Sequence, residues 1–224
     1  MSVRIISVVV FGLVGAAILV SFGVWQMQRL AWKTDVLAEI EARIGATPVE
    51  LPEVMNREAD RYLPVEVTGQ FSGAPVRVLV SVQGSGPGYR LISRFEVAGQ
   101  SILVDRGFLA DAIDVPDAPE GEVTVTGNLH WPDEVDGYTP APDMARNIWY
   151  ARDVDALAAH LGAEPIFIVL REISVPDTPV TPLPVTGEGI PNNHLVYAIQ
   201  WFSLAFVWLG MTAFLLWRIT RRTI

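Results

Sequence analysis

LVYAIQWFSLAFVWLGMTAFLLW occupies positions 195–217 and carries no formal charge. Three arginines follow it within five residues, and the polar triplet Asn192-Asn193-His194 precedes it. About 20 apolar residues, at a rise of 1.5 Å each, cross a hydrocarbon core ~30 Å thick. The stretch therefore predicts a membrane-spanning helix with arginines at one end and His194 at the other.

A second apolar run, IISVVVFGLVGAAILVSFGVW, occupies positions 5–25. The alternative reading is a secretory signal peptide, whose apolar region is shorter, at ~7–15 residues, and is followed by a small-residue cleavage site. The sequence WQMQR follows here instead, which favours an uncleaved membrane anchor. Gly12, Gly15 and Ala16 would offer a small surface for close packing against another helix.

The two ends of the chain carry four arginines and no acidic residue, whereas all 25 acidic residues lie between the two spans. The positive-inside rule then places both termini in the cytoplasm or its mitochondrial equivalent and exports the segment between the spans. No Arg- and Ser-rich transit sequence precedes the first span, so we expect a bacterial inner membrane and a periplasmic domain. An acidic exported domain argues against nucleic-acid binding and against anchoring on anionic lipid. The absence of cysteine excludes disulfides and thiolate metal sites.

Apolar residues recur at helical spacing after the first span, so we expect the helix to continue through residues 27–44 and to end before Gly45. A short helix should begin after Asp153, a good N-cap, and end at Gly162. Residues 174–191 contain five prolines and read as a linker back to the membrane.

Between these segments the sequence is rich in β-branched residues and turn signals. The expected strands are residues 62–71, 76–82, 89–97, 101–110, 123–131, 147–150 and 164–170. The predicted fold is a membrane α+β protein in which two transmembrane helices flank one mainly antiparallel β domain with a short helix. The predicted domain boundaries are 1–25 for the first span with its tail, 26–194 for the exported domain, 195–217 for the second span and 218–224 for the basic tail.

Most candidate catalytic features have a structural explanation. Gly84, Gly86 and Gly88 precede a strand and not a helix, so they predict a hairpin turn and not a phosphate-binding loop. His130 and His160 lack companions at metal-ligand spacing and are expected to be surface or capping residues. The consecutive Asp105-Arg106-Gly107 predicts a local ion pair with a bulge at the glycine.

His194 is different because it lies beside an aromatic face of a membrane helix. Tyr197 and Trp201 share its side of the helix at spacings of three and seven. Such an imidazole could be an axial ligand of haem iron. A helix-capping histidine within an interfacial aromatic belt explains the same residues. If haem binds, its propionates could be met by Asn192, Asn193, Arg29 or Lys33.

Four groups of residues resemble the motifs of one known family. They are GVWQ at 23–26 with Arg29, Trp32 and Lys33; YLPV at 62–65 with GQF at 69–71; VDRGF at 104–108; and NNHL, YA and WF within 192–202. They are similar to the surfeit-locus family of cytochrome c oxidase biogenesis factors, and the likeness extends over the whole chain. The last motif is the most specific of the four, and Phe108 stands where the family commonly has tryptophan.

This resemblance implies an assembly factor, not an enzyme, for haem–copper (cytochrome c) oxidase. It implies binding of haem a at the outer membrane interface and its insertion into the catalytic subunit. The partners would be oxidase subunit I, haem a synthase and membrane lipid. His194 would bind the iron, Trp201 and Tyr197 would line the macrocycle, and Trp25 and Gln26 would approach from the first span. The alternative is a cofactor-free scaffold that stabilises an oxidase assembly intermediate.

Overall fold

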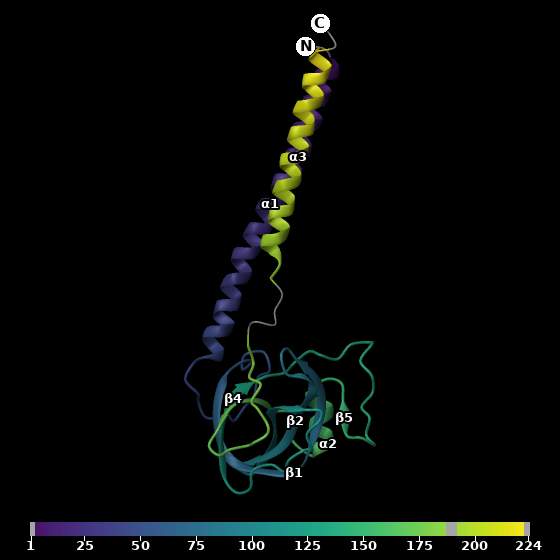
Figure 1. Cartoon of the computed structure of the whole chain (residues 1–224). Coiled ribbons are helices and arrows are strands. Elements are labelled where there is room, and N and C mark those ends of the chain that lie inside the picture. The colour runs from purple at the N-terminus through teal and green to yellow at the C-terminus, as the bar shows by residue number, and fades with distance from the viewer. Residues whose placement is uncertain (1–2, 187–191, 222–224) are drawn as a thin grey trace. The chain divides into compact units, whose positions relative to one another are not determined.

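The computed structural model describes residues 3–186 and 192–221. Its internal contacts divide the chain into a helical unit, Met1–Glu39 with Gly187–Ile224, and a β unit, Ile40–Thr186 (Figure 1). The predicted class is confirmed: two long apolar helices near the chain ends flank a sheet domain with a short helix. The predicted membrane boundaries at residues 25 and 195 stay predictions.

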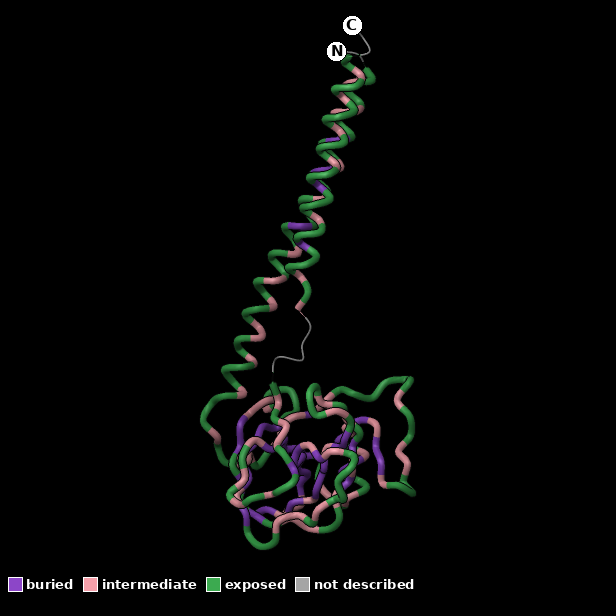
Figure 2. Tube along the Cα trace, viewed as in Figure 1, coloured by how far each residue is buried: buried purple, intermediate pink, exposed green. Residues whose placement is uncertain are grey.

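The helical unit contains most of α1, Val3–Ile44, whose last five residues belong to the β unit, and all of α3, His194–Arg221. Helix α1 is one element, so the predicted extension through residues 27–44 is confirmed. Both helices are long and apolar enough to cross a membrane, and most of their surface is exposed (Figure 2). Apolar side chains exposed over such a length are typical of helices that face lipid.

Helices α1 and α3 run antiparallel, because contacts move toward the start of α1 as they move toward the end of α3. Small residues fill the interface: Gly12, Ala16 and Gly23 are buried on α1, and Ala198 and Ala205 are buried on α3. Their spacings of four residues, from Gly12 to Ala16, and of seven, from Ala16 to Gly23 and from Ala198 to Ala205, are those of a two-helix seam. Small residues let the two backbones approach closely, as the sequence predicted for the first span.

Larger side chains of α3 enter the gaps left by glycines of α1. A Cβ atom at Gly15 would lie 2.5 Å from the Trp208 ring, and one at Gly23 would lie 2.6 Å from the Phe202 ring. The Trp208 indole also donates a 3.0 Å hydrogen bond to the carbonyl oxygen of Gly12. These contacts fix the register of the two helices.

The β unit contains six strands. They are β1 Pro64–Val82, β2 Gly86–Val97, β3 Gln100–Ala110, β4 Val123–Leu129, β5 Ile148–Trp149 and β6 Phe167–Ile173. Their order is β2-β3-β6-β4-β1-β5, and a further pairing of β1 with β2 closes the sheet into a barrel. The pairings are antiparallel except β3–β6 and β1–β5, so the prediction of a mainly antiparallel sheet is confirmed.

Closure depends on the length of β1. Its first part, Pro64 to Gly69, pairs with β4, and its second part, from Gln70 onward, pairs with β2. The sequence predicted two strands here, 62–71 and 76–82, whereas the structure has one strand with an irregularity between Ser72 and Val76. Alternate residues of β1 point into the barrel, and a buried cluster of aliphatic and aromatic side chains fills its interior.

The short helix α2, Val154–Leu161, forms as predicted. The Asp153 side chain accepts a hydrogen bond from the N–H of Ala156, and Gly162 ends the helix in the left-handed conformation at φ 66°. Leu157 is fully buried and packs into the core of the β unit.

The segment after β6 differs from the prediction of a linker. Strand β6 begins and ends three residues later than expected, and residues 174–186 belong to the β unit. Thr181 and Phe108 exchange two backbone hydrogen bonds, and Val180 is buried. Residues 187–191 of the predicted linker lie outside the described residues.

Candidate functional site

His194 begins α3 and contacts α1 directly. Its Nδ1 atom lies 2.7 Å from Oε1 of Gln26. An amide oxygen only accepts hydrogen bonds, so this contact selects the tautomer that carries its proton on Nδ1. Nε2 then has a free lone pair, and within residues 3–186 and 192–221 it makes no hydrogen bond. An imidazole held in this way is suited to ligating a metal centre.

The helix register explains why these two residues meet. Gly23 lies one turn before Gln26 and receives the Phe202 ring, while Trp201 packs on Phe22 with ring centroids 4.9 Å apart. Both contacts are interhelical and close to the His194–Gln26 pair along the chain. They hold the first turn of α3 beside Gln26.

Apart from His194, the predicted site residues are the aromatic or amide residues Trp25, Gln26, Tyr197 and Trp201. Their contacts in the structure differ. Gln26 contacts His194, and Trp201 packs against α1 through Phe22. Trp25 and Tyr197 are about half exposed, at 55% and 49%, and make no ring stacking contact with any described residue. The structure thus joins His194 to Gln26 and leaves the rings of Trp25 and Tyr197 accessible.

A cation lies one turn beyond Trp25 on α1. The guanidinium of Arg29 sits 3.9 Å from the centre of the Trp32 ring, which is a cation–π contact. On α3, Asn192 and Asn193 directly precede His194, and the Oδ1 atom of Asn192 is buried without a hydrogen-bond partner among the described residues. The surroundings of His194 therefore offer aromatic, amide and cationic groups.

No group of three or more His, Asp or Glu side chains capable of holding a metal ion occurs among the described residues. A metal ion bound by His194 would therefore need further ligands from a group other than these side chains. The iron of a haem has such ligands, because the macrocycle supplies four of them.

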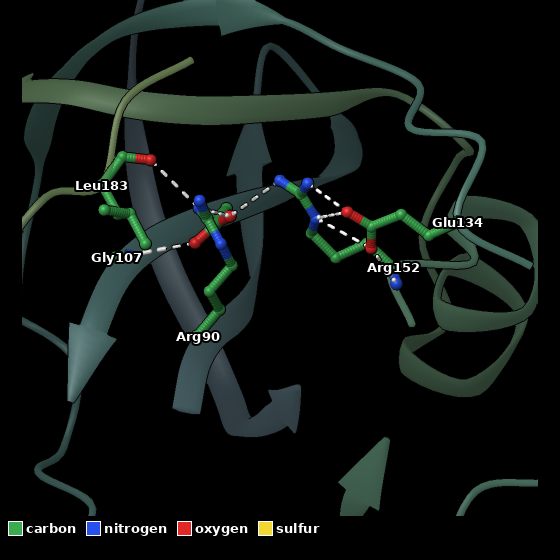
Figure 3. Close-up of polar contacts among 6 residues, drawn as sticks. Arg90, Gly107, Glu134, Arg152 and Leu183 are labelled. Atoms are coloured by element: carbon green, nitrogen blue, oxygen red, sulfur yellow. Dashed lines mark hydrogen bonds and ion pairs between the residues drawn. The ribbon is translucent and has the colours of Figure 1, made fainter. Parts of the chain in front are cut away.

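The β unit holds a second polar cluster, which the sequence did not predict (Figure 3). Asp105 is completely buried, and Arg90 donates to its Oδ2 atom at 2.6 Å. The N–H of Gly107 donates to Oδ1 of Asp105 at 3.1 Å, and Arg152 lies 3.8 Å from Oδ2 while also pairing with Glu134. The cluster joins two neighbouring strands to the loops that precede α2.

The pKa values of the two carboxylates in this cluster shift in opposite directions. Burial raises the pKa of Asp105, and the arginines only partly oppose it. Burial also acts to raise the pKa of Glu134, but hydrogen bonding and charge from Arg152 outweigh it and hold that pKa below its usual value. Buried charges satisfied by several partners are typical of a structural network.

The predicted local ion pair between Asp105 and Arg106 is wrong. Successive side chains of a strand point to opposite faces, so Asp105 pairs with Arg90 while Arg106 pairs with Asp177. The predicted bulge is confirmed: the register between β2 and β3 shifts here, and Gly107 has φ 122°. A Cβ atom at Gly107 would lie 2.1 Å from the carbonyl oxygen of Thr181.

The expected surface or capping position describes His130 only in part, because the residue is half-buried and lies outside the helices. Its ring stacks on Tyr62 with centroids 5.3 Å apart. Burial, followed by the positive charges of Arg152 and Arg61, lowers the pKa of His130 to about 4. His160 is exposed in the last turn of α2, as expected for a histidine at a helix end.

The architecture combines a closed β barrel with an antiparallel pair of long apolar helices, α1 and α3, which we call the hairpin, and a positioned histidine begins α3. The SURF1 family model matches residues 13–206, which is most of the chain. The chain belongs to the SURF1 family.

Individual relatives agree with this assignment. The chain is 32% identical to Surfeit locus protein 1 of Homo sapiens over 209 residues, covering 82% of this chain and 69% of the human protein. It is 30% identical to Surfeit locus protein 1 of Xenopus tropicalis, covering 82% and 67% of the two chains. A SURF1-like protein of Monosiga brevicollis is 29% identical, covering 94% of this chain and 84% of its own length.

Sequence reasoning singled out His194 and Gln26 as candidates but did not predict the contacts that position them. Phe22, which packs on Trp201, is one of many apolar residues in the first span and carried no separate signal. One pattern in the sequence could have indicated this contact. Large side chains recur every seven residues on the second apolar stretch, and glycines on the first could make room for them.

Proposed function

We propose that this chain is a membrane-bound assembly factor for haem–copper (cytochrome c) oxidase, which binds haem a at His194 and assists its insertion into the catalytic subunit. The observation that carries the proposal is the 2.7 Å contact between Nδ1 of His194 and Oε1 of Gln26. That contact leaves Nε2 available for iron and fixes the ring plane. Membership of the SURF1 family supports the same role.

The surroundings of His194 suit a haem as cargo. A macrocycle is flat and largely apolar, and the half-exposed rings of Trp25 and Tyr197 offer apolar surface beside the histidine. Arg29, Asn192 and Asn193 are cationic or amide groups of the kind that bind propionates. In this proposal one imidazole from this chain holds the iron, so the site is weak enough to release its cargo.

Transfer requires a donor and an acceptor. We propose that haem a synthase supplies the haem and that oxidase subunit I receives it, with membrane lipid surrounding the two helices. No covalent bond of the haem changes in this process. The protein would therefore act as a carrier and not as an enzyme.

The proposed location is a bacterial inner membrane crossed twice, with both termini in the cytoplasm and the β unit in the periplasm. The support is the charge distribution: Arg4, Arg218, Arg221 and Arg222 are the only charged residues outside the two apolar runs and the segment between them. Cysteine labelling of single-cysteine variants tests the topology cleanly, because the natural chain has no cysteine. A label at Ser85 should react from the periplasm.

The central experiment is the optical spectrum of the chain purified in detergent from cells that make haem a. The wild type should carry haem, and His194→Ala should lose most of it. His160→Ala is the matched control, because His160 is an exposed histidine in the β unit. A haem-free wild type, or full haem retention in His194→Ala, would overturn the proposed ligand.

The same variants separate the proposal from a cofactor-free scaffold. A carrier predicts that His194→Ala lowers the amount of haem a in assembled oxidase. If oxidase assembles normally with His194→Ala while substitutions on the surface of the β unit block assembly, the scaffold is the correct function.

A further inference from the structure

An apolar groove runs along one side of the α1–α3 hairpin. Its larger part has a volume of about 1070 Å³, and an adjoining part of about 420 Å³ shares three of its wall residues. We call both parts together the hairpin groove. Its walls include Phe11, Ile18, Leu204, Val207, Trp208 and Met211.

The groove presents hydrocarbon and aromatic surface. None of its described lining residues is charged, and its polar groups are used within the hairpin. The indole N–H of Trp208 donates to Gly12, and the hydroxyl of Thr212 donates to the carbonyl oxygen of Trp208 at 2.8 Å. The surface left for an occupant is therefore apolar.

The groove lies on the side of the hairpin that carries the accessible rings near His194. Residues seven apart on a helix lie on nearly the same side. On α1, Phe11 and Ile18 in the groove are followed at this interval by Trp25. On α3, Leu204 in the groove is preceded at this interval by Tyr197.

The chemical nature of the side chains on one face of the hairpin thus changes along its length, from polar to aromatic to aliphatic. Arg29 and His194 are at one end, the rings of Trp25 and Tyr197 follow, and the apolar groove continues beyond them. Leu204 lies ten residues past His194, which is about 15 Å along the helix. This order of cation, ligand, flat apolar surface and hydrocarbon groove matches a ligand with a polar edge, a planar ring and a long apolar chain.

We propose that the hairpin groove binds the long isoprenoid side chain of haem a while His194 binds the iron. This inference rests on the proposed haem-binding function. It adds the basis of selectivity: haem b lacks the chain and would leave the groove without its occupant. The groove would make the carrier specific for haems that bear the chain.

The test compares three haems bound to the full chain in detergent micelles, each titrated by its optical spectrum. Haem a and haem o carry the chain, haem b does not, and haem o lacks the formyl group of haem a. Binding of haem a and haem o should be at least about tenfold tighter than binding of haem b, because only they fill the groove. Equal affinity for all three would overturn the inference.

A substitution in the groove should remove this preference. Val207 contributes to both parts of the groove, so Val207→Trp should weaken haem a and haem o about tenfold and leave haem b unchanged. Phe206→Trp is the matched control, because Phe206 is a neighbouring α3 residue that is 80% exposed and does not line the groove. Retention of the wild-type preference in Val207→Trp would contradict the assignment.

Competition with free farnesol gives a readout that needs no variant. Farnesol should weaken binding of haem a and leave haem b unaffected, and no effect on haem a would overturn the inference. If phospholipid chains or a helix of a partner protein occupy the groove instead, the wild type will bind the three haems alike. Failure of the carrier function looks different, because the wild type would then bind none of the haems through His194.

Discussion

Arg106 and Asp177 form a two-bond ion pair across 71 positions of sequence: Nε donates at 2.8 Å and Nη2 at 2.5 Å to the two carboxylate oxygens. The arginine side chain is completely buried, and the aspartate is 7% exposed. The pair fastens the segment after β6 to β3, next to the backbone hydrogen bonds between Phe108 and Thr181. The residues that follow β6 are thereby part of the barrel wall.

Removing one member of this pair should be costly. Asp177→Asn leaves a buried guanidinium without its counter-charge, and we expect a loss of about 3–5 kcal/mol in the free energy of unfolding. Denaturant unfolding of the full chain in detergent, followed by tryptophan fluorescence, measures it. Asp155→Asn is the control, because it breaks an equally well-aligned arginine pair at an exposed position and should cost about 0.5 kcal/mol. Similar losses in the two variants would show that burial does not matter here.

His130 predicts a pH dependence of stability. Its folded-state pKa is lowered to about 4 from an unfolded value of 6.5, so below about pH 6.5 the unfolded chain binds a proton that the folded chain does not. The free energy of unfolding should therefore fall between pH 6.5 and 4, by roughly 2–3 kcal/mol, and the contribution is fully present above pH 6.5.

The variant His130→Gln isolates this contribution, because glutamine does not titrate. Its unfolding free energy should change less between pH 6.5 and 4 than that of the wild type, whereas His160→Gln should behave as the wild type does. Glu134 acts in the same direction at lower pH: its lowered pKa makes it stabilising above its unfolded value, and this is lost on further acidification. Identical pH profiles for wild type and His130→Gln would refute the prediction.

In the proposed haem site, Gln26 should determine how tightly His194 binds iron. Gln26→Leu removes the acceptor at Nδ1 and frees the ring to rotate and to change tautomer, so haem affinity should fall about 10- to 100-fold while ligation persists. A titration monitored at the haem absorption bands measures the change. Gln28→Leu is the matched control on the same helix, at an exposed position. An unchanged affinity in Gln26→Leu would mean that the contact does not orient the ring during binding.

The glycines of α1 should be intolerant of larger side chains only where α3 fills the space beside them. Gly15→Leu would clash with the Trp208 ring and should destabilise the hairpin by about 1–3 kcal/mol. Gly210→Leu on α3 is the control, because a Cβ atom there meets nothing within 4 Å. The stability can be measured by titration with sodium dodecyl sulfate, followed by helical circular dichroism. The signal should be lost at a lower detergent concentration in Gly15→Leu than in the wild type, whereas Gly210→Leu should behave as the wild type does.

Local patterns in the sequence were sufficient to predict most helices and strands, but not which strands pair or which charged side chains meet. The two long apolar helices, the helix α2 with both of its caps and the positions of most strands follow from hydrophobic length, from periodicity and from capping chemistry. The barrel closure does not, because β1 reads as two strands until its pairing with both β4 and β2 is known. The partner of Asp105 was missed for the same reason: the nearest arginine in sequence points to the opposite face.

In the candidate site, too, the residues were identifiable from the sequence but their contacts were not. His194 was identifiable because a titratable residue at a predicted membrane boundary beside aromatic rings is unusual, and Gln26 because it directly follows the other predicted span. Their direct contact depends on the register set by Gly23 and Phe202, which is a property of two distant segments. The hairpin groove depends on the same register and has no signature in either helix alone.

The closed barrel also limits how the β unit can recognise other proteins. Many proteins bind partners by adding a strand to an exposed sheet edge, with main-chain hydrogen bonds supplying the affinity. The pairing of β1 with both β2 and β4 closes most of this sheet, and the stretches left with a strand on one side only are short: residues 79–82 of β1, for example, pair with β2 alone among the described strands. Strand addition is therefore limited to such short stretches, and most recognition by this unit would depend on side chains and loops, which can change between relatives without altering the barrel.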